Sequence, residues 1–324
     1  MVDGSFGKGK IKAPGFPSPF LKAPAMTVKL SAFPKCYLDD ISHAKTMSVF
    51  DWIEMAKSLD ADGLEMYEGF LWQLDDAYLD QVRDAIHGAG FEMPMLCCSP
   101  DFTNPDPAAR KKAIEYQIRM IQVSFRLGGP SVVCRVLSGQ RYPEVEREQG
   151  LVWVAECIEA CLVEARRIGV RLGIENHYKD GHWRYPEFAQ KMDVFLDLLG
   201  RIPEREFFGV QYDPSNAIVA GDDPIELLKR VAPRVISMHA SDRYLEPGHT
   251  LEELKQADGT LGYAPFLKHG VTGKGLNDYD RIFQLLSEVG YRGWISIEDG
   301  MNGLDEMQES LKFLRSKVAQ YFPG

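Results

Sequence analysis

Apolar residues along the chain follow two alternating patterns, short continuous runs and longer stretches with helical spacing. Continuous apolar runs are typical of parallel strands that are buried on both faces. They occur at residues 27–33, 63–67, 91–98, 131–137, 170–176, 207–213, 235–240 and 294–299. The helical stretches that follow them lie at residues 48–59, 74–90, 106–128, 151–169, 185–200, 223–231, 279–290 and 303–322. The sequence therefore predicts eight strand–helix units.

Eight such units predict a single (β/α)₈ TIM barrel, which we expect to span residues 27–324. A doubly wound open sheet is the alternative architecture. That fold usually carries a glycine-rich phosphate loop directly after its first strand. The segment after the first predicted strand, SAFPKCYLDD, does not have this composition. The barrel is therefore the better prediction.

Two segments do not fit a minimal barrel. Residues 1–26 are rich in Gly, Pro and Lys and lack the apolar stretch of a signal peptide, so they predict an extended N-terminal arm. A partner or a neighbouring subunit could order this arm, and a loose tail is the alternative. Residues 244–276 form a long insertion after the seventh strand, and long loops in barrels often act as lids or partner surfaces.

Composition limits the classes of partner. The chain has 324 residues, 45% of them hydrophobic and 26% charged, as is ordinary for a globular protein. A net charge of −10 disfavours binding to a phosphate backbone. No apolar run reaches the length of about 18 residues that a membrane helix needs. With six scattered cysteines, we expect a cytoplasmic protein with reduced thiols, no nucleic-acid or membrane partner, and a small neutral substrate.

The last four predicted strands each end on a residue that could bind a metal. These residues are Glu175, Asp213, His239 and Glu298. The C-terminal ends of barrel strands converge and carry the chemistry of this fold. Three carboxylates that meet there repel one another unless a cation joins them. One nitrogen and three oxygen donors favour Mn²⁺, with Co²⁺ or Mg²⁺ as alternatives, over a structural zinc ion.

Each of these residues also has a purely structural interpretation. Asp213 could simply cap the helix that follows it, and His239 could be a hydrogen-bonded core histidine. The agreement of four strand ends favours the metal site. The second predicted strand ends near Glu65 and Glu68, which adds a possible acid on the near side.

Further residues near the strand ends are candidates for contact with substrate. His177 follows Glu175 closely and could act as a base or bind a hydroxyl group. Arg135 ends the fourth strand, where it could bind substrate or pair with Glu175. Polar and aromatic side chains in loops are typical of sugar sites. The remaining candidates of this kind are Glu68, His182 and Trp183.

Five stretches resemble blocks of the xylose isomerase-like sugar isomerases and epimerases, a group that includes endonuclease-IV-type repair enzymes. They are DGLEMYEGF, GIENHYKDGHW, QYDPSNAIVAGDDP, VISMHASDR and GKGLNDYDRIFQLLSEVGYRGWISIED. In the ketose 3-epimerases of this group, two glutamates bind the metal and also move the proton. The resemblance assigns these roles to Glu175 and Glu298, with Asp213 and His239 as the other two ligands.

The chain departs from the epimerase pattern at two positions. Asn216, which we also expect to contact substrate, stands where those enzymes have a histidine, three residues after the metal-binding aspartate. Arg243 matches their substrate-binding arginine, but it lies closer in sequence to His239. The additional histidines of the repair enzymes have no counterparts, which together with the net charge argues against DNA repair.

The resemblance implies an isomerase or epimerase that removes a proton beside the carbonyl of a sugar or keto-sugar, through an enediolate stabilised by the metal. The alternative is a lyase on the same scaffold. That lyase is the large subunit of a C-glycoside deglycosidase, which eliminates the aglycone from a 3-oxo-glycoside together with a small β-rich subunit. A non-catalytic scaffold is the third hypothesis. We expect a homo-oligomer or a complex with such a second subunit.

Overall fold

The computed structural model describes residues 28–256, 264–298 and 300–323. The predicted arm, residues 1–26, lies outside the described residues.

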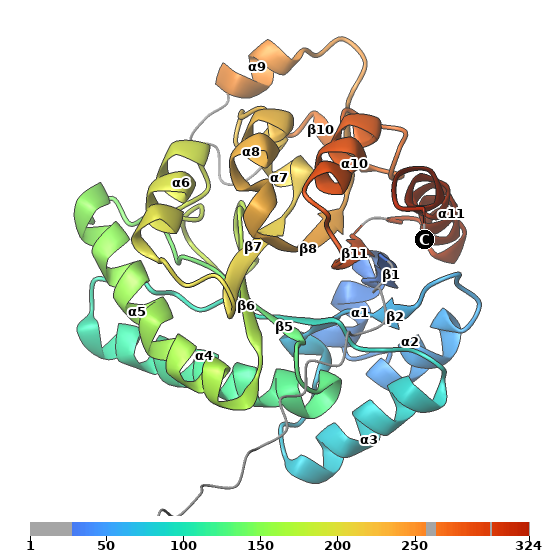
Figure 1. Ribbon diagram of the computed structural model, residues 1–324, viewed down its shortest axis with the longest axis horizontal. Helices are drawn as coiled ribbons and strands as arrows, with labels where there is room; N and C mark the ends of the chain where they lie inside the picture. The colour runs from blue at the N-terminus through green and yellow to red at the C-terminus, as the bar shows by residue number, and fades with distance from the viewer. Residues whose placement is uncertain (1–27, 257–263, 299, 324) are drawn as a thin grey trace, which may run out of the picture.

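Nine strands form one parallel sheet that closes almost completely into a barrel (Figure 1). The order of neighbours around it is β2-β1-β11-β8-β7-β6-β5-β4-β3. The strands are β1 (Lys29–Ala32), β2 (Gly63–Leu64), β3 (Met66–Tyr67), β4 (Met95–Cys97), β5 (Val133–Val136), β6 (Arg171–Glu175), β7 (Phe208–Tyr212), β8 (Val235–Ala240) and β11 (Trp294–Ile297).

Two of these strands are halves of one predicted strand. β2 and β3 are separated only by Glu65, whose backbone N–H donates to the carbonyl of Ala32 at 3.1 Å. β2 pairs with β1, and β3 pairs with β4. The interrupted strand thus joins the two ends of the sheet, and the predicted (β/α)₈ TIM barrel is confirmed.

The strand register places the candidate ligands near the same end of neighbouring strands, each within two residues of the level of the next. In the β11–β8 pair Ser296 lies beside His239, and in the β6–β7 pair Glu175 lies beside Gln211. Parallel strands all point the same way, so their C-terminal ends face one mouth of the barrel. Loops that leave these ends can therefore share a single site.

Helices surround the strands as an outer ring (Figure 1). The eight predicted ones are α2 (Val49–Ala56), α3 (Asp76–Gly88), α4 (Pro107–Gly128), α5 (Arg147–Ile168), α6 (Met192–Arg201), α8 (Pro224–Val231), α10 (Tyr279–Glu288) and α11 (Leu304–Tyr321). Shorter helices, which the apolar pattern does not reveal, are η1 (Lys35–Tyr37), α1 (Leu38–Ser42), η2 (Glu68–Phe70), α7 (Pro214–Val219), η3 (Ala232–Arg234) and α9 (Leu251–Gln256).

The largest error in a predicted helix boundary is at the start of α6. The sequence predicts a helix from residue 185, but α6 begins at Met192. The backbone N–H of Glu187 donates to the carbonyl of Tyr178, and that of Phe188 donates to the carbonyl of Gly139. These bonds to other loops take the place of the bonds that a helix would form.

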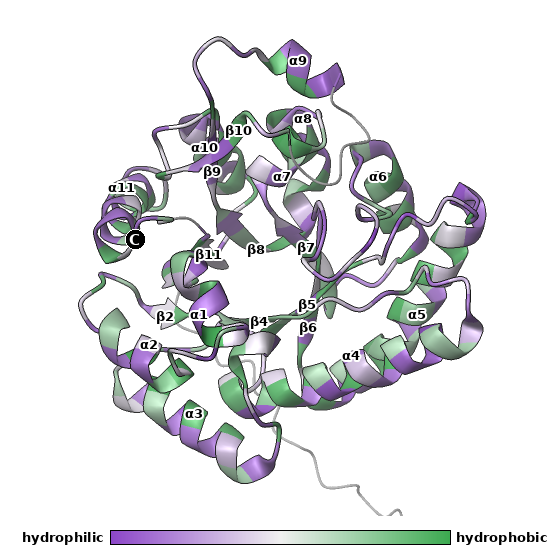
Figure 2. Cartoon of the chain, turned by 180° about the vertical axis from the view of Figure 1, so that it is seen from behind, coloured by the Kyte–Doolittle hydropathy of each residue, from purple (hydrophilic) through white to green (hydrophobic). Residues whose placement is uncertain are grey.

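The outer helices are amphipathic, and their apolar faces pack on the barrel. In Figure 2, green and purple positions alternate along α3 and α4. The inward face of α10 buries Ile282, Phe283 and Leu286 completely. Full burial of one such side chain contributes roughly 1.5–3 kcal/mol, so this packing supplies most of the force that holds the helices in place.

The insertion after β8 contains a second, smaller sheet. β9 (Asp242–Leu245) and β10 (Leu267–Gly270) pair in antiparallel fashion. The buried carboxylate of Asp242 accepts the backbone N–H groups of Gly273 and Gly275, each at 3.0 Å, and that of Asn277 at 3.2 Å. Asp242 therefore fixes the return of the chain from the insertion to α10.

Two expectations about the whole chain can be compared with this structure. All six cysteines are free, as predicted. Among the described residues, no helix combines the length and the apolarity that crossing a membrane requires.

Candidate metal centre

The four predicted ligands meet at the mouth of the barrel. Glu175 ends β6, Asp213 follows β7, His239 lies in β8 and Glu298 follows β11. Each offers one ligand atom, and these four atoms all lie within 4.8 Å of one another. Glu175, Asp213 and His239 are buried, while the side chain of Glu298 is 13% exposed. Positions far apart in the sequence thus form one cluster.

The imidazole of His239 faces all three carboxylates with the same nitrogen. Its Nδ1 lies 3.4 Å from Oε1 of Glu175, 3.3 Å from Oε2 of Glu298 and 3.9 Å from Oδ2 of Asp213. A metal ion bound by such a set would lie among these four atoms. The other ring nitrogen, Nε2, points to a different neighbour.

The two glutamates are each held from the outside by a cation. Arg135 Nη1 donates to Oε2 of Glu175 at 2.8 Å, and Asn216 Nδ2 donates to its Oε1 at 2.9 Å. Lys35 Nζ donates to Oε1 of Glu298 at 2.7 Å. These bonds orient the carboxylates toward the cluster and offset part of their negative charge.

Asp213 serves its structural role and faces the cluster at the same time. Its Oδ1 caps α7 by accepting the backbone N–H groups of Ser215 at 2.7 Å and Asn216 at 3.1 Å. The hydroxyl of Ser241 donates to the same oxygen at 2.9 Å. Because these donors occupy only Oδ1, they leave Oδ2 directed toward His239.

The charges in the cluster perturb one another strongly. Burial and the negative charges of Glu298 and Glu175 raise the pKa of Asp213 to about 7. Burial opposes the charged form of His239, but the surrounding carboxylates hold its pKa well above its usual range. Burial likewise opposes the charged form of Glu298, but Lys35 and His239 hold its pKa well below the usual range. Closely packed negative charge of this kind fits a divalent cation.

Two residues of the centre were missed by sequence analysis as site residues. Lys35 lies in η1, where a lysine after an apolar strand is usually a solvated residue. Glu65 accepts a hydrogen bond from Nε2 of His239 at 2.8 Å and is completely buried. The sequence indicates an acid near this strand end, but it does not say that Glu65 rather than Glu68 points into the barrel.

A cavity of about 330 Å³ lies over the centre. Its walls combine aromatic, aliphatic and charged side chains, as is usual for small-molecule sites. Glu298, Lys35 and His239 form part of its floor. The other lining residues are Phe33, Cys36, Leu38, Asp39, His43, Glu65, Tyr67, Cys97, Arg135, His177, Tyr178, Lys179, Asp180, Gly181, His182 and Met301.

Three of the predicted substrate contacts line this cavity: Arg135, His177 and His182. His177 stacks on Tyr178 with the ring centroids 4.8 Å apart, and its Nδ1 has no hydrogen-bond partner among the described residues. Burial lowers the pKa of His177 to about 4, so its ring is neutral at pH 7. His182 lies in an exposed loop with its ring 5.4 Å from that of His43.

The other four predicted contacts lie outside the lining of the cavity. Asn216 donates a hydrogen bond to Glu175, and Trp183, which follows His182 in the chain, is only 8% exposed. Arg243 is a buried member of β9, and Glu68 is half-buried in η2. The side-chain directions in these segments depend on contacts between distant loops, which local sequence patterns do not encode.

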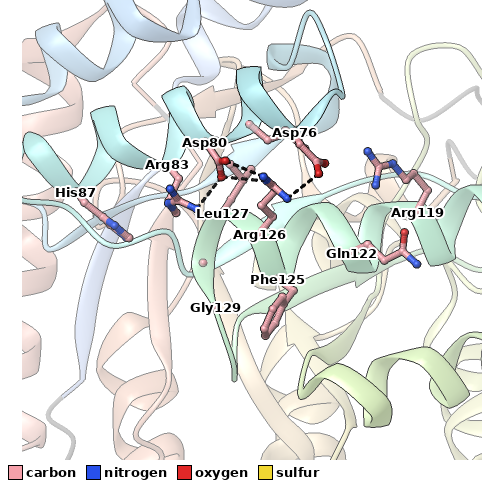
Figure 3. Close-up of a pocket in the computed structure, with 12 residues that line it drawn as sticks. Asp76, Asp80, Arg83, His87, Arg119, Gln122, Phe125, Arg126, Leu127 and Gly129 are labelled. Atoms are coloured by element: carbon pink, nitrogen blue, oxygen red, sulfur yellow. Dashed lines mark hydrogen bonds and ion pairs between the residues drawn. The ribbon is translucent and has the colours of Figure 1, made fainter.

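A second hollow, of about 540 Å³, lies on the outer wall between α3 and α4 (Figure 3). Its charged groups bind one another. Asp80 pairs with Arg83 and Arg126, each at 2.7 Å, and Arg126 also pairs with Asp76 at 3.1 Å. These ion pairs tie α3 to α4, and the hollow lies away from the metal centre.

Comparison with known proteins supports the description of the fold. Residues 53–317 match the model of the family described as xylose isomerase-like TIM barrel. The chain belongs to this family. Its closed parallel barrel is the fold that the family resemblance implies.

Relatives within and around this family carry several different names. An inosose dehydratase from Geobacillus kaustophilus is 30% identical over 165 residues, which are 49% of this chain and 50% of the relative. The chain thus spans about half the length of the curated relatives it matches. A D-tagatose 3-epimerase-like protein has a TM-score of 0.68 at 17% identity, covering 91% of this chain and 98% of that one.

A further solved structure, of the IOLI protein, contains a bound zinc atom. It has a TM-score of 0.66 at 16% identity, covering 92% of this chain and 100% of that one. At such low identities, both structural likenesses support the barrel fold alone.

Proposed function

We propose that this protein is a divalent-metal-dependent enzyme that removes a proton next to the carbonyl of a sugar or keto-sugar. The observation that carries the proposal is the position of Glu298. This carboxylate belongs to the ligand cluster, lines the cavity and is held by Lys35 on one oxygen only. Its low pKa keeps it ionised at neutral pH, so it is able to accept a proton.

Each residue of the centre has a role in this proposal. Glu175, Asp213, His239 and Glu298 would hold the metal, whose positive charge stabilises the negative charge that develops on the substrate oxygens. Mn²⁺ is our first choice, because oxygen donors dominate the set. Glu298 takes the proton. Arg135 donates hydrogen bonds from the cavity wall, and the neutral ring of His177 is placed to bind a hydroxyl group.

Isomerisation or epimerisation is the first candidate outcome. Epimerisation returns the proton to the opposite face of the carbon, which requires a second base. Glu175 would be that base, but its side chain is completely buried behind Arg135 and Asn216. We therefore expect Arg135 to move when a substrate enters, if this outcome is the correct one.

Elimination is the second candidate, and two observations favour it. Only one base is needed to remove a proton and expel a leaving group, and Glu298 is the only one of the two glutamates that lines the cavity. Curated relatives that match about half of the chain are also named inosose dehydratases, and a dehydratase eliminates water. The C-glycoside lyase with a small second subunit is a further form of the same chemistry.

Proton NMR in D₂O would test the proposal. Mn²⁺ would be used for turnover and removed with a chelator before the spectra are recorded. A ketohexose, an inosose and a 3-oxo-C-glucoside would be offered separately.

Deuterium beside the carbonyl together with a new sugar would support isomerisation or epimerisation. Loss of water or of the aglycone would support elimination. No exchange and no product with any of the three, from protein that binds Mn²⁺, would contradict the proposed activity on these substrate classes and favour a scaffold.

A further inference from the structure

The two nitrogens of the His239 imidazole have different surroundings. Nδ1 faces the three carboxylates of the ligand cluster. Nε2 points into the barrel, where it lies 2.8 Å from Oε1 of Glu65. A histidine that binds a metal uses one nitrogen as the ligand, and the hydrogen bond of the other nitrogen decides which one.

Glu65 is an unusual residue for its location. It is completely buried, at the break between β2 and β3, and its neighbours include the apolar side chains that fill the barrel. The thiol of Cys97 donates to the same Oε1 at 3.1 Å. Oε2 has no hydrogen-bond partner among the described residues. Burying a carboxylate in this way is costly unless an ion pair or hydrogen bonds offset the lost hydration, so packing alone does not account for a glutamate at this position.

We propose that Glu65 is a positioning residue for the metal centre. Its carboxylate accepts the Nε2–H of His239, and this bond leaves the lone pair of Nδ1 directed at the ligand cluster. The thiol of Cys97, donating to the same oxygen, holds the carboxylate in the orientation that His239 needs. The inference rests on the proposed function in one respect, because it concerns the same metal site.

The electrostatic consequence follows from the same bond. A carboxylate behind the imidazole makes Nδ1 a stronger donor to a cation than it would be in an isolated ring. The bond also removes the ability of the ring to turn and present Nε2. The centre therefore needs five side chains to be competent, the four ligands and Glu65.

Gln211 is the other polar neighbour of this ring. Its amide Nε2 lies 2.7 Å from Nε2 and 2.9 Å from Nδ1 of His239, so this contact is shared by both ring nitrogens and does not distinguish them. An amide is neutral, whereas the bond to Glu65 is assisted by charge and is roughly twice as strong. The structure therefore assigns the ring orientation to Glu65.

Glu65, Cys97 and His239 also place three possible ligand atoms within 4.8 Å of one another. If these residues held a second metal ion, Nε2 would be a ligand rather than a donor to Glu65. The two interpretations differ in stoichiometry. The positioning role requires one ion per chain, and the second site requires two.

Titration with Mn²⁺, followed by the EPR signal of the free ion, tests the role of Glu65 without any substrate. We expect Glu65→Gln to weaken Mn²⁺ binding about 10–100-fold, as removal of such a partner typically does. Glu68→Gln is the matched control, because Glu68 lies three residues further on and outside the ligand cluster. It should change the affinity less than about twofold.

A second measurement uses the unaltered protein and so does not depend on whether the variant folds. With ¹⁵N-labelled histidine and Zn²⁺ as a diamagnetic probe, long-range proton–nitrogen correlations report which nitrogen of each ring carries the proton. The chain has seven histidines, and His239→Asn identifies the relevant signal. We expect a protonated Nε2 and a metal-bound Nδ1.

The outcomes separate this inference from the proposed function. Wild-type protein that binds no Mn²⁺ would contradict the metal-dependent function itself. Normal binding by wild type, with Glu65→Gln within twofold of it, would overturn only the positioning role. A metal-bound Nε2, or two ions per chain with the second lost in Cys97→Ser, would also overturn that role and identify a second metal site.

Discussion

Glu298 and Glu175 occupy similar places in the ligand cluster but differ in their access to the cavity. Lys35 bonds Oε1 of Glu298, Oε2 lies 3.3 Å from Nδ1 of His239, and the residue lines the cavity. Arg135 and Asn216 bond both oxygens of Glu175 and cover it. This difference in access supports the proposal that Glu298, besides being a candidate ligand, is the first base, whereas Glu175 could act as a base only after Arg135 moves.

The first expected result concerns Glu298. Replacing it by Gln should reduce turnover at saturating Mn²⁺ by about 10²-fold or more, because a positioned base contributes roughly 10²–10⁴-fold. Initial rates measure the effect, and circular dichroism checks the fold. The control is Glu288→Gln, which alters an exposed acid at the end of α10 and should keep normal rates. Near-normal turnover in Glu298→Gln would remove this residue from the mechanism.

A second expected result concerns Glu187, a completely buried acid behind His177. Burial raises its pKa to about 8, against the opposing hydrogen bonds from Ser138. The folded protein thus binds a proton that the unfolded chain releases near pH 4.5. The stabilisation from this proton is complete below about pH 4.5 and is lost as the pH rises through about 8.

Urea unfolding at several pH values measures this effect. Between pH 5 and 8, the free energy of unfolding of wild type should fall relative to Glu187→Gln by roughly 1.4 kcal/mol per pH unit at most. Gln keeps an oxygen that can accept the bonds from Ser138 but has no titrating proton. Parallel curves for the two proteins would show that Glu187 is not protonated in the fold.

At the scale of elements, the sequence was most informative where apolar runs end on a polar residue. Asp213, His239 and Glu298 were recognisable because an apolar strand forces the next polar side chain to the barrel mouth. Lys35 was not recognisable, since a lysine in a short turn is usually solvated. The start of α6 was missed because Glu187 and Phe188 bond distant loops, and helical periodicity carries no information about such bonds.

The prediction at the scale of elements concerns Asp242. Its buried carboxylate binds three backbone N–H groups that follow the insertion, so Asp242→Ala should leave them without their acceptor. We expect a loss of roughly 2–4 kcal/mol in the free energy of unfolding. Proteolysis of the segment 244–276 should become faster.

Asp242→Asn is the matched variant for this test. It keeps one acceptor oxygen and should fall between wild type and Asp242→Ala. If Asp242→Ala were cut at the wild-type rate and had wild-type stability, the three hydrogen bonds to Asp242 would not be what holds the insertion in place.

At the scale of the whole molecule, the candidate metal centre lies where four strands of the barrel end. The ligands come from the ends of β6, β7, β8 and β11, which are adjacent in the sheet. A metal bound there would add a common anchor to the backbone pairing and to the side-chain hydrogen bonds, such as those of Asn216 to Glu175 and of Ser241 to Asp213, that already join these strands. Its removal should therefore affect the stability of the entire fold.

Thermal unfolding with and without a chelator measures this contribution. At a hundredfold excess of Mn²⁺ over its dissociation constant, binding to the folded state stabilises by about 2.7 kcal/mol, so the Tm should rise by several degrees. His239→Ala should unfold at the same temperature in both conditions. If the Tm of wild type were the same with and without Mn²⁺, the assignment of the metal centre would be contradicted.

The origin of the cavity walls has a consequence for how this protein could change over evolution. All four ligands lie between residues 175 and 298, whereas Phe33, Lys35, Leu38 and Tyr67 close the facing wall from the first part of the chain. Mutations of Phe33, Leu38 and Tyr67 can reshape what the cavity accepts without touching the four candidate ligands. Lys35 and Glu65 lie in the same part of the chain but bond Glu298 and His239, so new specificities can arise from a few wall positions while these two residues stay under selection for the chemistry.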